Sequence, residues 1–256
     1  MADYIWLLAP LFCGVLALIC NLILGRQVLQ RGIIFIDLAM AQVAALGMLI
    51  ITLYWPDLTN QYELIPLLGA CALALVVGGG IAWLEAKKVD NLEALIGTFY
   101  VMSACLGILL VSQAPHAHER ATSLLHGQLL WSSWTDVAAL ALLAGGLVSI
   151  RWLRPRLLDG IGFYCLFALS IPLLVQSLGV YLEFAMLVIP AIAATYCLPN
   201  WRNSMALVIG LLGLITGFSL SMWLDVPSGP TVVLMIGIFA LVLPVILRLK
   251  RSFVSI

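Results

Sequence analysis

Charged residues are scarce in this chain. Only 9% of its 256 residues are charged, against about 25% in a soluble globular domain, and apolar residues make up 64%. The few charged residues cannot cover so large an apolar core in water, and the composition therefore excludes a water-soluble enzyme. The chain is also too apolar to be disordered. The formal net charge is zero, which argues against a nucleic-acid-binding protein. We therefore expect an integral membrane protein.

The sequences that commonly mark catalytic sites are also missing. There is no phosphate-binding Gly-x-x-x-x-Gly-Lys-Ser/Thr loop, no Gly-x-Ser-x-Gly and no His-Glu-x-x-His. The six cysteines all lie inside apolar stretches without Cys-x-x-Cys spacing, which is typical of small packing residues. We expect no catalytic residues and no cofactor bound by this chain, which is therefore not predicted to hydrolyse ATP.

Long apolar runs dominate what is present. They predict an all-α, polytopic bundle of about nine transmembrane helices in a single domain over residues 1–256, because a helix of about 20 apolar residues spans a bilayer. Continuous runs exclude the alternating pattern of a membrane β-barrel. The runs at 160–177 and 179–198 are nearly continuous, so a count of eight also stays open. The expected spans are 4–25, 33–54, 64–84, 92–113, 134–152, 160–177, 179–198, 204–224 and 230–248.

The positions of lysine and arginine predict the orientation. With the N-terminus outside and nine spans, eleven of the twelve basic residues fall on the cytoplasmic side and only Arg120 falls outside. Cytoplasmic loops of membrane proteins carry such an excess of positive charge. We therefore expect the C-terminus inside.

Two carboxylates fall inside predicted spans. Asp37 lies near the inner start of the second span, and Glu183 lies in the seventh, toward its outer end. An ionised carboxylate in hydrocarbon costs several kcal/mol, so such a group faces a cavity or a partner unless it reaches water. A translocation path past Asp37, its neighbours Met40 and Gln42, and Glu183 is one interpretation. A residue that reaches water at the end of a span is the other.

Pro190 and three histidines are further candidates. Proline removes a backbone donor, so Pro190 predicts either a broken helix that lines the path or an ordinary kink. His116, His118 and His126 share the longest outer loop, and imidazoles are ligands for zinc, iron and copper. A tentative metal site of these histidines and a solvated loop both fit the sequence, and Asp37 is a further tentative metal ligand.

Five segments, in order, resemble a known family. The sequence Gly-Val-Tyr-Leu at 179–182, followed by Leu-Val-Ile-Pro-Ala at 187–191, is similar to the Gly-Val-x-Leu and Leu-Val-Ile-Pro-Ala run of the ABC-3 permeases. These are the membrane subunits of bacterial importers of zinc, manganese or iron. The resemblance covers about residues 5–248. The other segments that carry it are 31–47, 91–97, 126–136 and 228–234.

The resemblance implies a multi-pass permease subunit in a bacterial inner membrane. It implies a paired, homodimeric permease, a cytoplasmic ABC ATPase that holds the ATP, and an extracytoplasmic metal-binding protein that delivers the ion. By position it implies that the third cytoplasmic loop couples to the ATPase. The loop residues that we assign to this contact are Arg151, Arg154, Arg156 and Asp159.

The sequence departs from the family pattern at three places. The family has Gly-Asp-x-x-x-His where this chain has Asp37-Leu-Ala-Met-Ala-Gln42, so the family histidine falls on Gln42 and the aspartate on Leu38. Residues at i and i+5, such as Asp37 and Gln42, stand about 140° apart on a regular helix and cannot chelate one ion together. The third cytoplasmic loop is shorter than in the family, and Glu183 replaces a small or apolar residue.

These observations favour the permease subunit of an ATP-driven importer for a divalent transition metal, zinc or manganese. Two alternatives remain open at this point. One is a permease of the same kind with a non-metal substrate, because the Asp37–Gln42 turn is altered. The other is a membrane scaffold or regulator that has lost transport, because the coupling loop is short.

Overall fold

The computed structural model describes residues 7–62, 64–112 and 129–254, and within these ranges it contains helices and no strand. This confirms the all-α class. The long helices are α1 (Leu8–Arg31), α2 (Ile36–Tyr54), α4 (Ile65–Ala86), α5 (Leu92–Ser112), α7 (Trp134–Leu153), α8 (Gly160–Leu178), α9 (Val180–Thr195), α10 (Arg202–Leu224) and α11 (Ser228–Val254). The short ones are α3 (Pro56–Gln61), η2 (Leu129–Trp131), η3 (Pro155–Leu158) and η4 (Pro199–Trp201).

Eight of the described helices are long and apolar enough to cross a membrane. The remaining expected span, the seventh at 179–198, corresponds to α9, which has 16 residues and is therefore about 24 Å long, against a hydrocarbon core of about 30 Å. The number of crossings thus stays a prediction.

The packing of α9 fixes its direction. Asn21 of α1 bonds to Glu183 of α9, and Gly25, one turn later, lies against Leu187, also one turn later. The two helices therefore run parallel, whereas α10 runs antiparallel to α1. Nine alternating crossings require these directions for the first, seventh and eighth spans.

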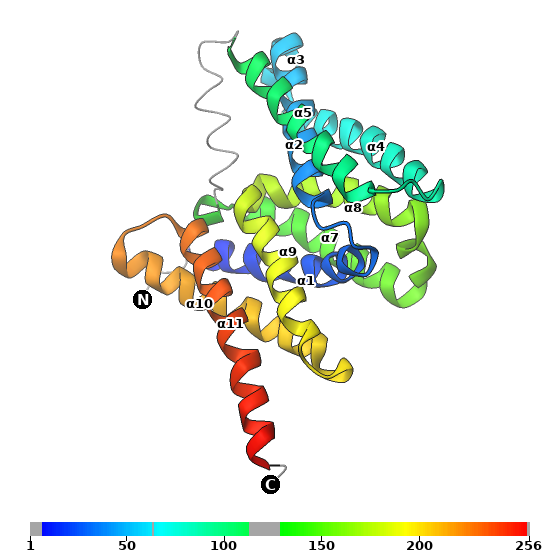
Figure 1. Ribbon diagram of the computed structural model, residues 1–256. Coiled ribbons are helices and arrows are strands. Elements are labelled where there is room, and N and C mark those ends of the chain that lie inside the picture. Colours follow the sequence, from blue (N-terminus) through cyan, green and yellow to red (C-terminus); the bar gives the residue numbers. More distant parts are fainter. Residues whose placement is uncertain (1–6, 63, 113–128, 255–256) are drawn as a thin grey trace.

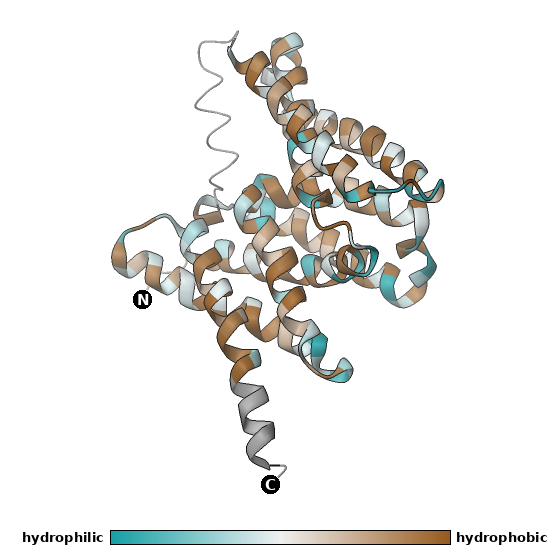
Figure 2. Ribbon diagram, viewed as in Figure 1, coloured by the Kyte–Doolittle hydropathy of each residue, from teal (hydrophilic) through white to brown (hydrophobic). Residues whose placement is uncertain are grey.

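Helix α1 lies at the centre of the bundle (Figure 1), packed against α7, α9 and α10. In its most apolar window 61% of the residues are buried, against 11% for α5. Helices α2, α4 and α5 form a group to one side that meets the rest mainly through α8 and also through the contact of α2 with α9. Hydrophobic residues run along the helices and hydrophilic ones gather at helix ends and turns (Figure 2), as lipid-facing helices require.

Glycine, not proline, interrupts the helix between α8 and α9. Gly179 has φ 81° and ψ 158°, a region that essentially only glycine adopts, and it separates Leu178 from Val180. Pro190 lies inside α9, which continues through it to Thr195. The expectation of a helix broken at Pro190 is therefore wrong. The proline only deprives the carbonyl of Met186 of its helical donor.

The turn after α1 is held by Arg31. Gly32 ends α1 in the left-handed conformation with φ 67°. The guanidinium of Arg31 donates to both carboxylate oxygens of Glu85 at 2.9 Å and to the carbonyl of Leu158 at 3.3 Å, and it lies 4.7 Å from the ring centre of Phe163. These contacts tie the ends of α1 and α4 and the start of α8 together at one end of the bundle.

Candidate functional site

Three polar side chains are buried among apolar residues where α1, α2 and α9 meet. Asn21, Asp37 and Glu183 are 0%, 1% and 0% exposed. They come from three helices, and α1 and α9 are in register through the close contact of Gly25 with Leu187. We call these three residues the carboxyl cluster.

One hydrogen bond joins two members of the carboxyl cluster. The side-chain amide of Asn21 donates to Oε2 of Glu183 at 2.9 Å. The charge of Asp37 acts on the Glu183 carboxyl, so the two acids are electrostatic neighbours. Three oxygens of the carboxyl cluster have no hydrogen-bond partner among the described residues: Oδ1 of Asn21, Oδ1 of Asp37 and Oε1 of Glu183.

No cationic side chain of the described residues neutralises the carboxyl cluster. Within the described ranges the one ion pair is that of Arg31 with Glu85, which does not involve Asp37 or Glu183. Burying an ionised group costs several kcal/mol even after the protein relaxes. Asp37 and Glu183 lie in the first turns of α2 and α9, whose dipoles offset at most about 2 kcal/mol each. The carboxyl cluster therefore favours added positive charge, either a proton on a carboxyl group or a cation beside it.

Glu183 lies deeper than the sequence suggests. It contacts Asn21, which is 13 residues after Leu8 and 10 before Arg31 along α1. At 1.5 Å per residue these separations are about 20 Å and about 15 Å, so Glu183 lies near the middle of the span and not at its outer end. Asp37 is also buried. Neither carboxylate reaches water by extending from a span end.

The other residues expected along the path do not join the carboxyl cluster. Met40 is fully buried and packs against Gly78 of α4. Gln42 is half-buried on α2, which is a continuous α-helix from Ile36 to Tyr54. Without a distortion of α2, Asp37 and Gln42 face directions about 140° apart, as the spacing predicts.

The expected histidine site lies outside the described residues. His116, His118 and His126 fall in the segment 113–128, so that hypothesis stays a prediction. Among the residues that the structure does describe, no three His, Cys, Asp or Glu side chains form a group able to hold a metal ion. The carboxyl cluster is thus not a closed metal cage.

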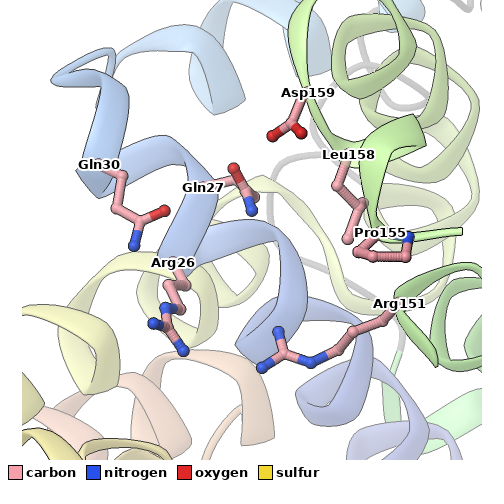
Figure 3. A pocket seen from close by; sticks show the side chains of 7 residues that line it. All are labelled: Arg26, Gln27, Gln30, Arg151, Pro155, Leu158 and Asp159. Carbon is pink, nitrogen blue, oxygen red and sulfur yellow. The ribbon is translucent and has the colours of Figure 1, made fainter.

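The four residues assigned to the third cytoplasmic loop separate into two pairs. Arg154 and Arg156 are exposed at the η3 turn. Arg151 and Asp159 instead line a pocket against α1, together with Arg26 (Figure 3). The loop between α7 and α8 contains only the η3 turn, which agrees with the short coupling segment expected from the sequence.

Sequence reasoning missed Asn21. It is the one amide in the apolar run of α1 before Gln27, and its mid-span position was a usable signal because buried polar groups seek partners. The partnership of Arg31 with Glu85 was also missed. The two residues are 54 positions apart, and no local pattern connects them.

Comparisons with known proteins agree on one kind of protein. The model of the ABC 3 transport family matches residues 3–158 and 149–247, and its two parts overlap at the η3 turn. A probable metal transport system membrane protein of Chlamydia pneumoniae is 25% identical over 91% of this chain and 86% of its own length. The high-affinity zinc uptake system membrane protein ZnuB of Haemophilus influenzae is 24% identical over 66% of this chain and 73% of its own.

A solved structure has the same fold. PsaBC from Streptococcus pneumoniae, determined in complex with Fab, matches with a TM-score of 0.73 and 17% identity, over 94% of this chain and 91% of the matched chain. At this identity the likeness concerns the arrangement of the helices.

Proposed function

The chain belongs to the ABC 3 transport family, and from this premise we propose that it is the membrane permease subunit of an ATP-driven importer of a divalent transition metal, zinc or manganese. The names of its relatives support the substrate class, since one is a zinc uptake protein and another a probable metal transport protein. The chain itself is a multi-span, apolar, helical protein of a bacterial inner membrane.

The observation that carries the proposal is the carboxyl cluster. Asp37 and Glu183 place two acids in a membrane protein's interior without a basic partner among the described residues. Ionisable residues held inside a membrane usually mark an ion pathway. A cation that passes these acids gains carboxylate and amide oxygens, and an incomplete cage lets it leave again, as transport requires.

The donors of the carboxyl cluster bear on the choice of metal. They are oxygens, which suit manganese better than zinc. One relative is a zinc uptake protein, so both metals belong in the test, with manganese favoured by the oxygen donors. In the same proposal Met40, Gln42 and Pro190 flank the path without binding the ion.

The permease needs partners, because it has no nucleotide-binding sequence of its own. In this proposal a cytoplasmic ABC ATPase binds and hydrolyses ATP, an extracytoplasmic binding protein delivers the metal, and two copies of this chain form the pore. The ATPase contact is the loop 151–162, led by the exposed Arg154 and Arg156.

Uptake of radioactive manganese and zinc by cells tests the function. Three strains are compared. The first lacks the chain, the second carries the chain with an active ATPase, and the third carries the chain with an ATPase whose hydrolysis is disabled. The proposal expects that one metal, or both, accumulates only when the chain and an active ATPase are present. Equal uptake of both metals in all three strains would contradict metal import and favour the non-metal substrate.

A further inference from the structure

A pocket of about 320 Å³ opens where the last turns of α1 and α7 meet η3. Arg26 and Gln27 of α1 line one wall, and Arg151 of α7 and Asp159 line the other. The guanidinium groups of Arg26 and Arg151 approach each other from the two helices, while Asp159 points toward Gln27 on the far side of the pocket (Figure 3). We call this the arginine pocket.

The two arginines of the arginine pocket lack an anionic partner. Within the described part of the chain neither Arg26 nor Arg151 makes a hydrogen bond or an ion pair, in contrast to Arg31, which bonds to Glu85. Two like charges that converge on one space repel each other unless an anion lies between them. The guanidinium fork matches the oxygens of a phosphate, which it binds through two parallel hydrogen bonds.

The arginine pocket lies at the depth of lipid headgroups. Arg26 is five residues from the end of α1 at Arg31, and Arg151 is two from the end of α7. Trp152 and Leu153, next to Arg151, are 84% and 81% exposed, and an exposed tryptophan at a helix end is typical of the membrane interface. Basic pockets between helices at this level bind phospholipid headgroups.

Asp159 limits the kind of headgroup that the arginine pocket can bind. A carboxylate opposite the arginines disfavours a purely anionic headgroup and favours one that also carries a positive charge. We propose that the arginine pocket binds a phosphoethanolamine headgroup of the membrane, with the phosphate on Arg26 and Arg151 and the ammonium on Asp159. Gln27 lies beside Asp159 and provides a further polar contact. The site requires neither metal nor ATPase, so it goes beyond the proposed function and is tested separately from it.

Lipid binding to the purified, delipidated full chain tests the proposal by native mass spectrometry. Phosphatidylethanolamine, phosphatidylglycerol, soluble glycerophosphoethanolamine and inorganic phosphate are titrated in separate arms. The unmodified chain is expected to retain one phosphatidylethanolamine more tightly than phosphatidylglycerol. Glycerophosphoethanolamine is expected to displace the lipid, and inorganic phosphate is not.

Variants assign the contacts. Arg26→Gln with Arg151→Gln should weaken phosphatidylethanolamine binding about tenfold or more, as the loss of hydrogen bonds to a charged group predicts. Asp159→Asn should abolish the preference over phosphatidylglycerol while leaving binding of the phosphate. Arg154→Gln is the matched control for lipid binding, because this exposed arginine of the same loop does not line the pocket, and it should leave the retention of both lipids unchanged.

Three outcomes would overturn the assignment. The first is equal retention of the two lipids by the unmodified chain, and the second is displacement by inorganic phosphate as efficient as by glycerophosphoethanolamine. The third is that the double arginine variant retains both lipids as well as the unmodified chain does but no longer binds an added ATPase. That last result would assign the arginine pocket to the partner protein and not to lipid.

Discussion

Replacing Asn21 by leucine removes the one hydrogen bond that the side chain of Glu183 receives from the described residues. Leucine keeps the branching of the asparagine side chain but carries larger methyl groups, so the change opens no cavity and adds some overpacking at a site that is 0% exposed. The lost bond is 2.9 Å long and ends on a carboxylate oxygen, and both oxygens of Glu183 are then without a partner. Hydrogen bonds to charged groups contribute about 1.5–3 kcal/mol.

The expected loss can be expressed as a melting temperature. About 2 kcal/mol corresponds to a decrease of about 4–8 °C for a domain of this size. Replacing Glu183 by leucine in addition removes the buried carboxyl together with its partner, and substituting apolar residues for a buried polar pair is often neutral or stabilising. The double variant Asn21→Leu, Glu183→Leu should therefore melt above the single variant Asn21→Leu, although it carries one more substitution.

The assay is thermal unfolding, in one detergent, of the unmodified chain, the two single variants and the double variant. Unfolding is measured, at one protein concentration, as the loss of the monodisperse size-exclusion peak after heating. The changes in melting temperature caused by the two substitutions should be strongly non-additive. A melting temperature of Asn21→Leu within 1 °C of that of the unmodified chain, or additive changes for the two substitutions, would refute this expectation.

Three further predictions concern packing, coupling and topology. Gly25→Ala should destabilise the chain by about 1–3 kcal/mol, because the added methyl group meets the backbone carbonyl of Leu187. Gly146→Ala, in open space on α7, should stabilise the chain slightly. Thermal unfolding distinguishes the two variants, and equal shifts in melting temperature would contradict the α1–α9 contact. Arg154→Glu should detach the ATPase in a pull-down or uncouple its hydrolysis from uptake, and intact assembly with full uptake would place the contact elsewhere. A cysteine at position 250 should react with a membrane-impermeant reagent only in inverted vesicles, and labelling of intact cells would reverse the predicted orientation.

The fold was largely predictable because hydrophobic length is a local property. Each predicted span corresponds to a helix of the structure, with shifts of a few residues at most ends. The boundary expected between the spans 160–177 and 179–198 coincides with Gly179, whose backbone conformation a helix cannot contain. For Pro190 the sequence left a broken helix and a kink open, and α9 continues through it, because inside a membrane neighbouring helices and local adjustment tolerate a proline.

The candidate site was only partly predictable, because it depends on contacts across the sequence. Asp37 and Glu183 could be selected for their cost in hydrocarbon, and both prove to be buried. Their relation to each other and to Asn21 depends on the parallel packing of α1 and α9, and residues 21 and 183 are 162 positions apart. The resemblance pointed to Asp37 and Gln42 on one helix, but the partners of an acid inside this bundle come from other helices.

Metal uptake by the Glu183→Gln variant tests the central claim most directly. The substitution keeps the size of the side chain and its contact with Asn21 but removes the ionisable carboxyl group from a fully buried position. Glu93→Gln is the matched control, because it makes the same change at the helix end where Glu93 accepts a hydrogen bond from Phe35. With equal amounts of each protein in the membrane, the account predicts that Glu183→Gln lowers manganese or zinc uptake about tenfold or more and that Glu93→Gln does not. Uptake by Glu183→Gln equal to that of the control would contradict a metal path through the carboxyl cluster.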